Sequence, residues 1–305
     1  MTIKKIILRS VSIFIVSAVG IASYFLYQEH IATRNFRNGD QTIVSRRFFE
    51  AKCIANLFNH NPLLKDLRIS GSSFPNLNVL DDLVREKKVS PDKVYIFDLT
   101  YEKMPYLEQH ALKWYGYKDI SKISDPWLEK SFSRALFLSA KAKYFELTSG
   151  KKLIDLKETD LVSEKEAIEK RGYHYLEPMG SNWLEDWSFV DKLVRIFETV
   201  PDDAWLYFHC AHGHGRTTTS MLIYDILKSD RAIPLSDILK RQYCIGGEDV
   251  RDTQVWENGT WNADELKARE QIIYYFYDYV HDPEGYPKNS FMTWKAKKDL
   301  HNPAI

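Results

Sequence analysis

Short apolar segments alternate with longer amphipathic stretches along most of the chain. The short, mainly apolar segments Val94–Leu99, Tyr173–Leu176 and Trp205–Phe208 predict strands, and the first is continuous enough to be a buried member of a sheet. Apolar residues at helical spacing predict four helices, over Leu77–Val84, Phe189–Thr199, Thr218–Leu227 and Ala263–Tyr279. Because strands alternate with helices, the expected fold class is α/β, with a sheet flanked by helices on both faces.

The remaining segments have weaker patterns. A loop is predicted over Ser70–Ser73, where serine and glycine cluster, and a short helix over Arg46–Asn59. Residues 117–170 are rich in charge and are predicted to be an insertion on the main fold. Within it we expect a helix near 126–141, followed by short strand-like pieces at 144–147 and 152–156.

The first 27 residues differ in character from the rest. Lys4, Lys5 and Arg9 precede an uncharged run from Val11 to Tyr27. A basic start before an apolar core is typical of a secretory signal, whereas about 18 apolar residues also suffice for an uncleaved anchor. We therefore expect residues 1–27 to be a signal peptide or an N-terminal membrane anchor, with membrane contact possible through residues 6–27. Either alternative places the rest of the protein outside the cytoplasm, secreted, periplasmic or anchored.

The composition excludes one class of partner. Lysine plus arginine equals aspartate plus glutamate, 42 each, so no overall basic field favours nucleic acid. The 44% hydrophobic content is ample for a packed core. Of the three cysteines, only Cys53 and Cys244 are available to pair if Cys210 stays reduced, and we expect both to be ordinary packed thiols.

One loop carries the chemistry of the sequence. His209-Cys210-Ala211-His212-Gly213-His214-Gly215-Arg216-Thr217 lies between a predicted strand and a predicted helix. In that order, backbone N–H groups and the positive end of the helix converge on one anion. The two glycines allow dihedral angles that other residues avoid. The residues expected to bind a phosphate group are Ala211, His212, Gly213, His214, Gly215, Arg216 and Thr217.

Two side chains of this loop are candidates for catalysis. The positive field of the loop favours the thiolate of Cys210, which makes it a nucleophile for phosphorus. Arg216 supplies a planar donor that matches two phosphate oxygens, and Thr217 is placed to donate to the sulfur. The alternatives are an inert core cysteine before an ordinary turn, or a zinc site. No second Cys/His cluster supports zinc, and we expect no metal or cofactor.

This loop and its surroundings resemble the bacterial protein-tyrosine-phosphatase-like (PTP-like) phytases. The segments that carry the resemblance are Asn35–Arg37, Leu67–Ser72, Phe97–Leu99, Trp114–Gly116, Asp203–Thr219 and Asp237–Gly247. The resemblance implies a PTP-like mixed sheet flanked by helices, with a small β-barrel-like subdomain to which residues 117–170 contribute. It implies that residues 28–305 form a cysteine phosphatase domain, which forms a phosphocysteine intermediate and hydrolyses phosphate monoesters, with inositol polyphosphates as the first expectation for substrate.

The resemblance also implies roles outside the loop. Arg37 and Arg68 become candidates for substrate phosphates, His209 is expected to orient the loop from behind, and Gln242 to position the hydrolytic water. The family carries Thr-Asp-His where this chain reads Glu177 to Trp187 without an Asp-His pair.

The general acid is therefore open on the sequence. Asp186, and after it Glu185, are the candidates, and the alternative is that both are carboxylates that stabilise a helix N-terminus. His212 and His214 are expected at the rim of the loop, where they either add positive charge below about pH 6.5 or are solvated bystanders.

The substrate is open as well. The segment from Glu248 to Glu257 contains Arg251 as its only base, where the family is rich in lysine, and Thr100 stands where the family usually has arginine. A less charged phosphorylated small molecule is therefore plausible, such as a lower inositol phosphate or a phosphoinositide headgroup. Alternatives are a phosphoinositide or phosphotyrosine phosphatase, or a catalytically weak phosphate-binding module.

Overall fold

The computed structural model describes residues 37–38, 67–100, 105–107, 110–111, 150, 161–180, 182–254 and 261–301. The chain divides into two compact units, one of 1–34, 75–83 and 103–167, and one of 35–74, 84–102 and 168–305. The predicted elements over 1–27, 46–59, 126–141, 144–147 and 152–156 lie outside the described residues. Among the residues that are described, no helix combines the length and the apolar character that a membrane crossing requires.

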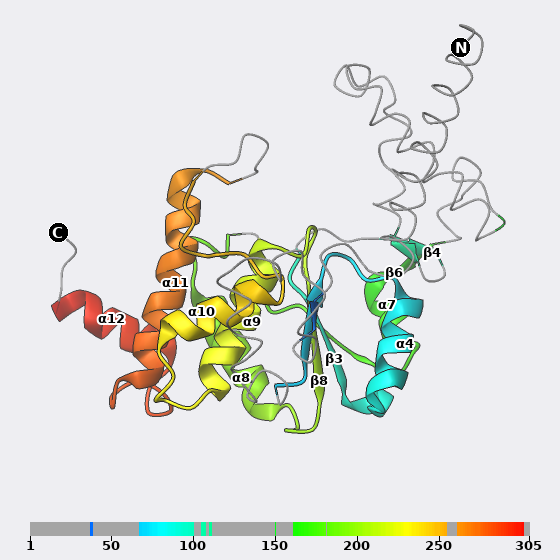
Figure 1. Ribbon diagram of the computed structural model, residues 1–305, viewed down its shortest axis with the longest axis horizontal. Coiled ribbons are helices and arrows are strands. Elements are labelled where there is room, and N and C mark those ends of the chain that lie inside the picture. Colours follow the sequence, from blue (N-terminus) through cyan, green and yellow to red (C-terminus); the bar gives the residue numbers. More distant parts are fainter. Residues whose placement is uncertain are drawn as a thin grey trace, which may run out of the picture. The chain divides into compact units, whose positions relative to one another are not determined.

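A five-stranded mixed sheet organises the larger unit (Figure 1). Its strands follow the order β1-β2-β8-β3-β7: Arg37–Asn38, Ile69–Ser72, Trp205–His209, Val94–Asp98 and His174–Leu176. The pairs β2–β8, β8–β3 and β3–β7 are parallel, and β1 pairs with β2 antiparallel. The three predicted strands are therefore present, and the α/β fold class is confirmed.

The middle of this sheet is buried on both faces, as its apolar sequence predicts. Every residue of β8 is buried, and stacked aromatic rings join it to β3, with the centroids of Phe97 and Phe208 4.6 Å apart. Phe197 packs against both rings and against Tyr224. This aromatic cluster packs across β3 and β8 and helps to hold the two strands in register, so that both end at the same edge of the sheet.

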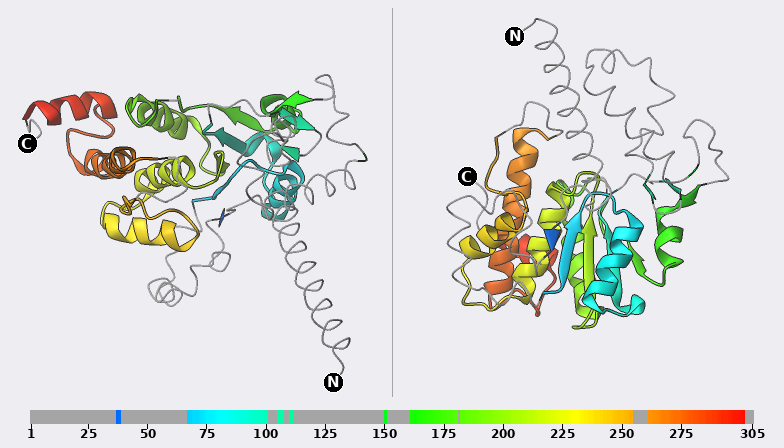
Figure 2. Two further views of the ribbon diagram at one scale, coloured as in Figure 1. Left: turned by 90° about the horizontal axis from the view of Figure 1, so that it is seen from above. Right: turned by 45° about the vertical axis from the view of Figure 1, so that its right-hand side comes forward.

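Five helices gather on one side of the sheet (Figures 1 and 2). They are α8 (Ser188–Thr199), α9 (Gly215–Lys228), α10 (Leu235–Cys244), α11 (Ala263–His281) and α12 (Phe291–His301). In α9, eleven of fourteen residues are buried, because this helix packs against the sheet and against α8, α10 and α11. A helix buried on all sides holds its own first turn in place, and that turn belongs to the loop that carries the chemistry.

Two of these helices, α10 and α12, were not predicted from the sequence. In α12 few residues are apolar, and its N-terminus is held by a residue about a hundred positions away in the chain. Asp191 of α8 accepts hydrogen bonds from the backbone N–H of Phe291 (2.6 Å) and of Met292 (3.2 Å). The local sequence of α12 gives no signal of this cap, because the capping residue lies in another helix. By contrast, α11 begins with a capping box between Asn262 and Glu265, and it was predicted almost to the residue.

The predicted loop over Ser70–Ser73 is wrong, because Ile69–Ser72 form the buried strand β2. Its polar side chains are satisfied by β8: Trp205 donates to the Ser70 hydroxyl (3.0 Å), and the Ser72 hydroxyl lies 2.7 Å from that of Tyr207. Gly71 lets α9 approach, since a Cβ there would lie 2.6 Å from the sulfur of Met221. The serine and glycine residues that suggest a turn in the sequence here allow α9 to pack close to β2.

The smaller unit contains a three-stranded antiparallel sheet in the order β5-β4-β6. Its strands are His110–Ala111, Pro105–Leu107 and Val162–Ser163, and the helices α4 (Leu77–Lys87) and α7 (Glu164–Glu169) include residues of this unit. The hydroxyl of Tyr106 is buried and lies 3.1 Å from the carbonyl oxygen of Pro75. A β-barrel-like subdomain with residues 117–170 stays a prediction.

The two described cysteines differ in their chemical state. Cys210 is a free, buried thiol, whereas Cys244, the last residue of α10, is disulfide-bonded. The expectation that Cys244 is an ordinary packed thiol was therefore wrong. Cysteines that form a disulfide across a long sequence separation carry no local sequence signal of the pairing.

The fold predicts a clear difference between a buried and an exposed ion pair. Asp225 of α9 is buried and accepts hydrogen bonds from Arg241 Nε (3.0 Å) and Gln242 Nε2 (2.7 Å). Asp225→Ala leaves the Arg241 charge buried without its partner, so we expect the free energy of unfolding to fall by about 3–5 kcal/mol. Asp202→Ala removes only an exposed partner of Lys228 and should change it by less than about 1 kcal/mol. Urea unfolding of both variants measures the difference, and equal losses would contradict the role of the buried pair.

Candidate active site

Three parallel strands end side by side at one edge of the sheet. Ser72, Asp98 and His209 are the last residues of β2, β3 and β8, and the strand register pairs His209 with both of the others. The carboxyl edge of a parallel sheet is where α/β proteins bind ligands. The candidate loop begins directly after His209, so the sheet delivers it to this edge.

Residues 210–214 connect β8 to α9, which begins at Gly215, three residues earlier than predicted. The N–H groups of the first helical turn therefore belong to the loop itself. Gly213 has a φ of +70°, and a Cβ there would lie 2.4 Å from the backbone of Ser72 and Ser73. Only glycine fits, because any side chain would meet backbone atoms of β2 and its continuation.

Cys210 lies at the base of this loop and is fully buried. Burial by itself opposes ionisation, but the charge of Arg216, a hydrogen bond from the Thr217 hydroxyl and the backbone N–H groups of His212 and Thr217 outweigh it. Together they hold the pKa of the Cys210 thiol below its ordinary value. The predicted proximity of Cys210, Arg216 and Thr217 is therefore present in the structure.

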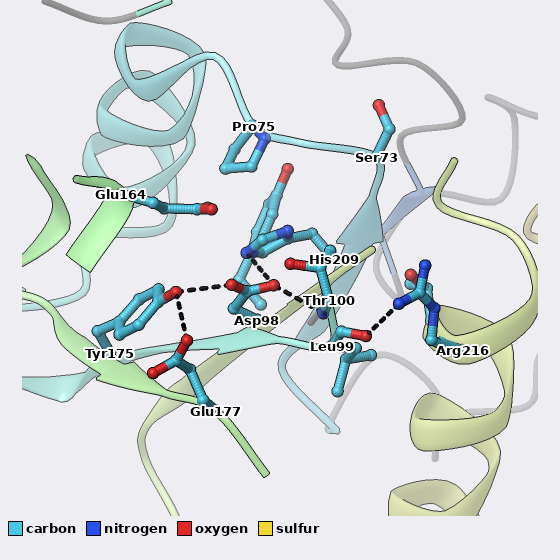
Figure 3. Close-up of polar contacts among 12 residues, drawn as sticks. Ser73, Pro75, Asp98, Leu99, Thr100, Glu164, Tyr175, Glu177, His209 and Arg216 are labelled. Atoms are coloured by element: carbon cyan, nitrogen blue, oxygen red, sulfur yellow. Dashed lines mark hydrogen bonds and ion pairs between the residues drawn. The ribbon is translucent and has the colours of Figure 1, made fainter. Parts of the chain in front are cut away.

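Arg216 is oriented by the end of the neighbouring strand. Its Nη1 donates to the carbonyl oxygen of Leu99 at 2.9 Å, and the N–H of Leu99 donates to the carbonyl of His209, also at 2.9 Å (Figure 3). A guanidinium is planar and rigid, so one fixed N–H orients its other donors. The segment that follows β3 thus sets the direction of the arginine.

A buried polar cluster supports the loop from behind (Figure 3). Asp98 accepts hydrogen bonds from the N–H of Thr100 (2.8 Å) and the hydroxyl of Tyr175 (2.6 Å). The Nε2 atom of His209, which is completely buried, lies 3.9 Å from Asp98. No role was predicted for Asp98 or Tyr175 from the sequence. The available signal was that an aspartate ends a buried strand, where water cannot solvate its charge.

His214 pairs with a carboxylate that comes from a distant segment. Its Nδ1 lies 2.5 Å from Oε1 of Glu248, whose side chain is buried. The backbone N–H of Glu248 donates to the Thr218 hydroxyl on α9 at 3.0 Å. The segment after Gly247 is poor in lysine, and its role as a partner of the loop was not predicted from the sequence.

Asp186 lies at the start of α8. Its carboxylate is exposed and accepts hydrogen bonds from the N–H and the hydroxyl of Ser188, both at 2.9 Å. These bonds lower the pKa of Asp186, which favours the charged form over the proton donor. The contacts match the alternative of a carboxylate at a helix N-terminus, and its assignment as general acid stays a prediction.

The predicted substrate arginines occupy opposite ends of β2. Arg37 lies opposite Gly71, close to the end of β2 that lies beside the start of the loop, and its side chain lies outside the described residues. Arg68 precedes β2 and donates to the carbonyl oxygen of Asp203 at 3.0 Å. Because β2 and β8 are parallel, this places Arg68 at the amino edge of the sheet, so its candidacy for substrate phosphate was wrong.

Two further polar residues have partners of their own. The amide of Gln242 donates to Asp225 at 2.7 Å, so it is tied to the second half of α9. Arg251 makes two hydrogen bonds to Asp249, both at 2.8 Å, which raise its pKa. The one base of the lysine-poor segment is thus already neutralised by a neighbour.

Comparisons with known proteins agree with this geometry. Residues 151–228 match the sequence model of the PTP-like phytase family, whose description reads "Inositol hexakisphosphate". The matched residues run from before β6 through the loop to the end of α9. The PTP-like myo-inositol phosphatase of Mitsuokella multacida, solved with myo-inositol-(1,3,4,5)-tetrakisphosphate, has a TM-score of 0.59 and 21% identity over 88% of this chain. A PTP-like phytase of Bdellovibrio bacteriovorus has a TM-score of 0.52 and 21% identity over 87% of this chain and 91% of its own.

The match to the PTP-like phytase family covers residues 151–228 of the 305 residues of the chain. The resemblance found in the sequence is thereby confirmed, and the structural likeness confirms the PTP-like phytase fold. Effector protein HopD2 of Pseudomonas syringae pv. tomato is 27% identical over 146 residues, 47% of this chain. The chain spans 31% of the length of HopD2 and 46% of the Mitsuokella protein.

The surroundings of Cys210 predict how its ionisation responds to substitution. Thr217→Val removes a hydrogen bond to the sulfur, so the pKa of the thiol should rise. Alkylation of Cys210 at a pH below the midpoint should slow roughly two- to tenfold, the range of one such bond. Thr219→Val is the matched control, because Thr219 is buried in the same helix and does not contribute to the pKa shift of Cys210. Equal rates in the two variants would show that Thr217 does not stabilise the thiolate.

Proposed function

We propose that this chain is a cysteine-dependent phosphatase that hydrolyses phosphate monoesters of inositol. The observation that carries the proposal is the lowered pKa of Cys210 within a loop that Gly213 and Arg216 complete. A thiolate at the base of an anion-binding loop is a nucleophile directed at phosphorus. The family match and the inositol tetrakisphosphate held by the Mitsuokella relative support inositol phosphates as the substrate class.

The proposed reaction has two steps. The thiolate of Cys210 attacks phosphorus, the S–P bond forms, and the bond from phosphorus to the leaving oxygen breaks as that oxygen receives a proton. The N–H groups of residues 211–216 and the guanidinium of Arg216 follow the equatorial oxygens as charge spreads over them. Water then attacks the phosphocysteine, which releases phosphate and restores the thiolate.

The charges near the loop favour a substrate with fewer phosphates than inositol hexakisphosphate. Arg251 is paired with Asp249, and the loop residue His214 is paired with Glu248. Thr100 stands where an arginine is usual in the family. We therefore propose lower inositol phosphates, with phosphoinositide headgroups and phosphotyrosine as the alternatives that the same loop accommodates.

Substituting the nucleophile tests the proposal. The wild-type protein should hydrolyse nitrophenyl phosphate and lower inositol phosphates, and Cys210→Ser should lower kcat by a factor on the order of 10³ or more. Thr219→Val, outside the loop, should retain the activity. Phosphate release from inositol hexakisphosphate, a tetrakisphosphate, a phosphoinositide and a phosphotyrosine peptide ranks the substrates. If wild type and Cys210→Ser are equally inactive while both bind phosphate, the chain is a phosphate-binding module.

We also propose that the protein acts outside the cytoplasm. The basic start and apolar run of residues 1–27 support export, with either cleavage or anchoring through residues 6–27. The disulfide of Cys244 supports an oxidising compartment. Fractionation of cells that express the full chain should place it in the periplasm, the medium or the membrane, and a protein recovered only from the cytoplasm contradicts export.

A further inference from the structure

The first step of the proposed reaction needs a proton donor for the leaving oxygen. In the described part of the segment from Glu177 to Trp187, Asp186 is engaged at the N-terminus of α8 and its pKa is lowered. We propose that His214, held in place by Glu248, donates this proton. The inference rests on the proposed phosphatase activity and adds a catalytic residue to it.

The position of His214 suits this role. It belongs to the phosphate-binding loop and immediately precedes α9. An in-line attack by Cys210 from the buried base of the loop places the leaving oxygen on the opposite side of phosphorus, which faces solvent. A proton donor must therefore reach the open side of the loop, where a loop residue with an exposed edge can lie.

The side chain of His214 is buried at Nδ1 but partly exposed as a whole. Its Nδ1 and the Oε1 of Glu248 are both inaccessible to solvent, although the side chain of His214 as a whole is 30% exposed. The exposed area of the side chain therefore lies away from Nδ1. The carboxylate at Nδ1 fixes the orientation of the ring, and Nε2 is the ring nitrogen that donates the proton in this proposal.

Glu248 is itself firmly anchored. Its N–H is bonded to Thr218 on α9, and the preceding N–H, that of Gly247, donates to the carbonyl of Gln242 at 2.8 Å. A buried carboxylate requires partners to offset its lost hydration, and His214 and the charge of Arg269 on α11 supply them. Besides Glu248, the charges that act on Arg269 are those of Asp252, Asp249 and Glu270. Within the loop, Arg216 is the charged group that acts on Cys210.

The proton balance closes over the two steps. In the first, the proton on Nε2 moves to the leaving oxygen as the P–O bond breaks, so the alcohol departs neutral and the imidazole becomes neutral. In the second, the neutral imidazole takes a proton from the attacking water as the new O–P bond forms and the S–P bond breaks. The enzyme returns to the imidazolium and thiolate state without any further reactant.

Comparing substrates whose leaving groups differ in basicity distinguishes proton donation by His214 from its other possible roles. In His214→Gln, kcat on an inositol phosphate should fall about 10²- to 10⁴-fold, whereas kcat on nitrophenyl phosphate should change only a few-fold, because a good leaving group needs no acid. The basic limb of the pH profile of kcat for the inositol phosphate should disappear. Glu248→Gln, which removes the group that positions the ring, should show the same dependence on leaving group with a smaller loss.

His174→Gln is the matched control. His174 lies at the amino end of β7, where its Nε2 bonds to the carbonyl of Asp92 at 2.8 Å, and its substitution should leave both substrates unaffected. A His214→Gln variant that loses activity equally on both substrates, or only in KM, overturns proton donation and makes His214 a binding residue. If that variant does not fold, Glu248→Gln decides, and equal losses on both substrates overturn the proposal.

The failure of this inference is distinguishable from that of the proposed function. Wild-type activity on nitrophenyl phosphate that depends on Cys210 establishes the phosphatase whatever His214 does. No Cys210-dependent hydrolysis of either substrate removes the phosphatase itself, and with it the need for a proton donor.

Discussion

A buried thiol whose pKa is nonetheless held below its ordinary value is the constraint on which the rest of this structure depends. Burial alone raises the pKa of Cys210, so the surroundings must supply more stabilisation than burial removes. Arg216 provides a full charge, Thr217 a hydroxyl, and the backbone two N–H groups. None of these reaches the sulfur unless the loop closes tightly around it, and Gly213 is the residue that permits this closure against β2.

The sheet and α9 hold this loop from both ends. The aligned ends of β2, β3 and β8 fix where it starts, and the first turn of α9 fixes where it ends. Gly71 brings α9 against β2, and the carbonyl of Leu99 directs Arg216. The loop is therefore a consequence of packing between elements that are far apart in the sequence, which explains why so much of the core surrounds one short segment.

The contrast between the loop and the distant elements that support it also explains which parts of the fold could be predicted from the sequence. The loop residues, the strands Val94–Leu99 and Trp205–Phe208, and α8 and α11 follow from local spacing and residue type. What could not be predicted depends on distant partners: β2 reads as a loop because its serines are satisfied by aromatic residues of β8, and α12 is capped from α8. Arg68 was misplaced because only the parallel register shows which end of β2 faces the loop.

The proposed proton donor, His214, belongs to the same loop as the proposed nucleophile. A cationic side chain at the rim of such a loop also attracts the phosphate, and a fixed anion beside it limits that attraction. The buried carboxylate of Glu248 provides such an anion, at 2.5 Å from His214 and anchored to α9. In this proposal the nucleophile, the N–H groups and the proton donor all belong to one loop, so their mutual geometry depends on that loop. The proposal gives the segment before α8 no catalytic role, and the contacts of Asp186 in that segment are those of a carboxylate at a helix N-terminus.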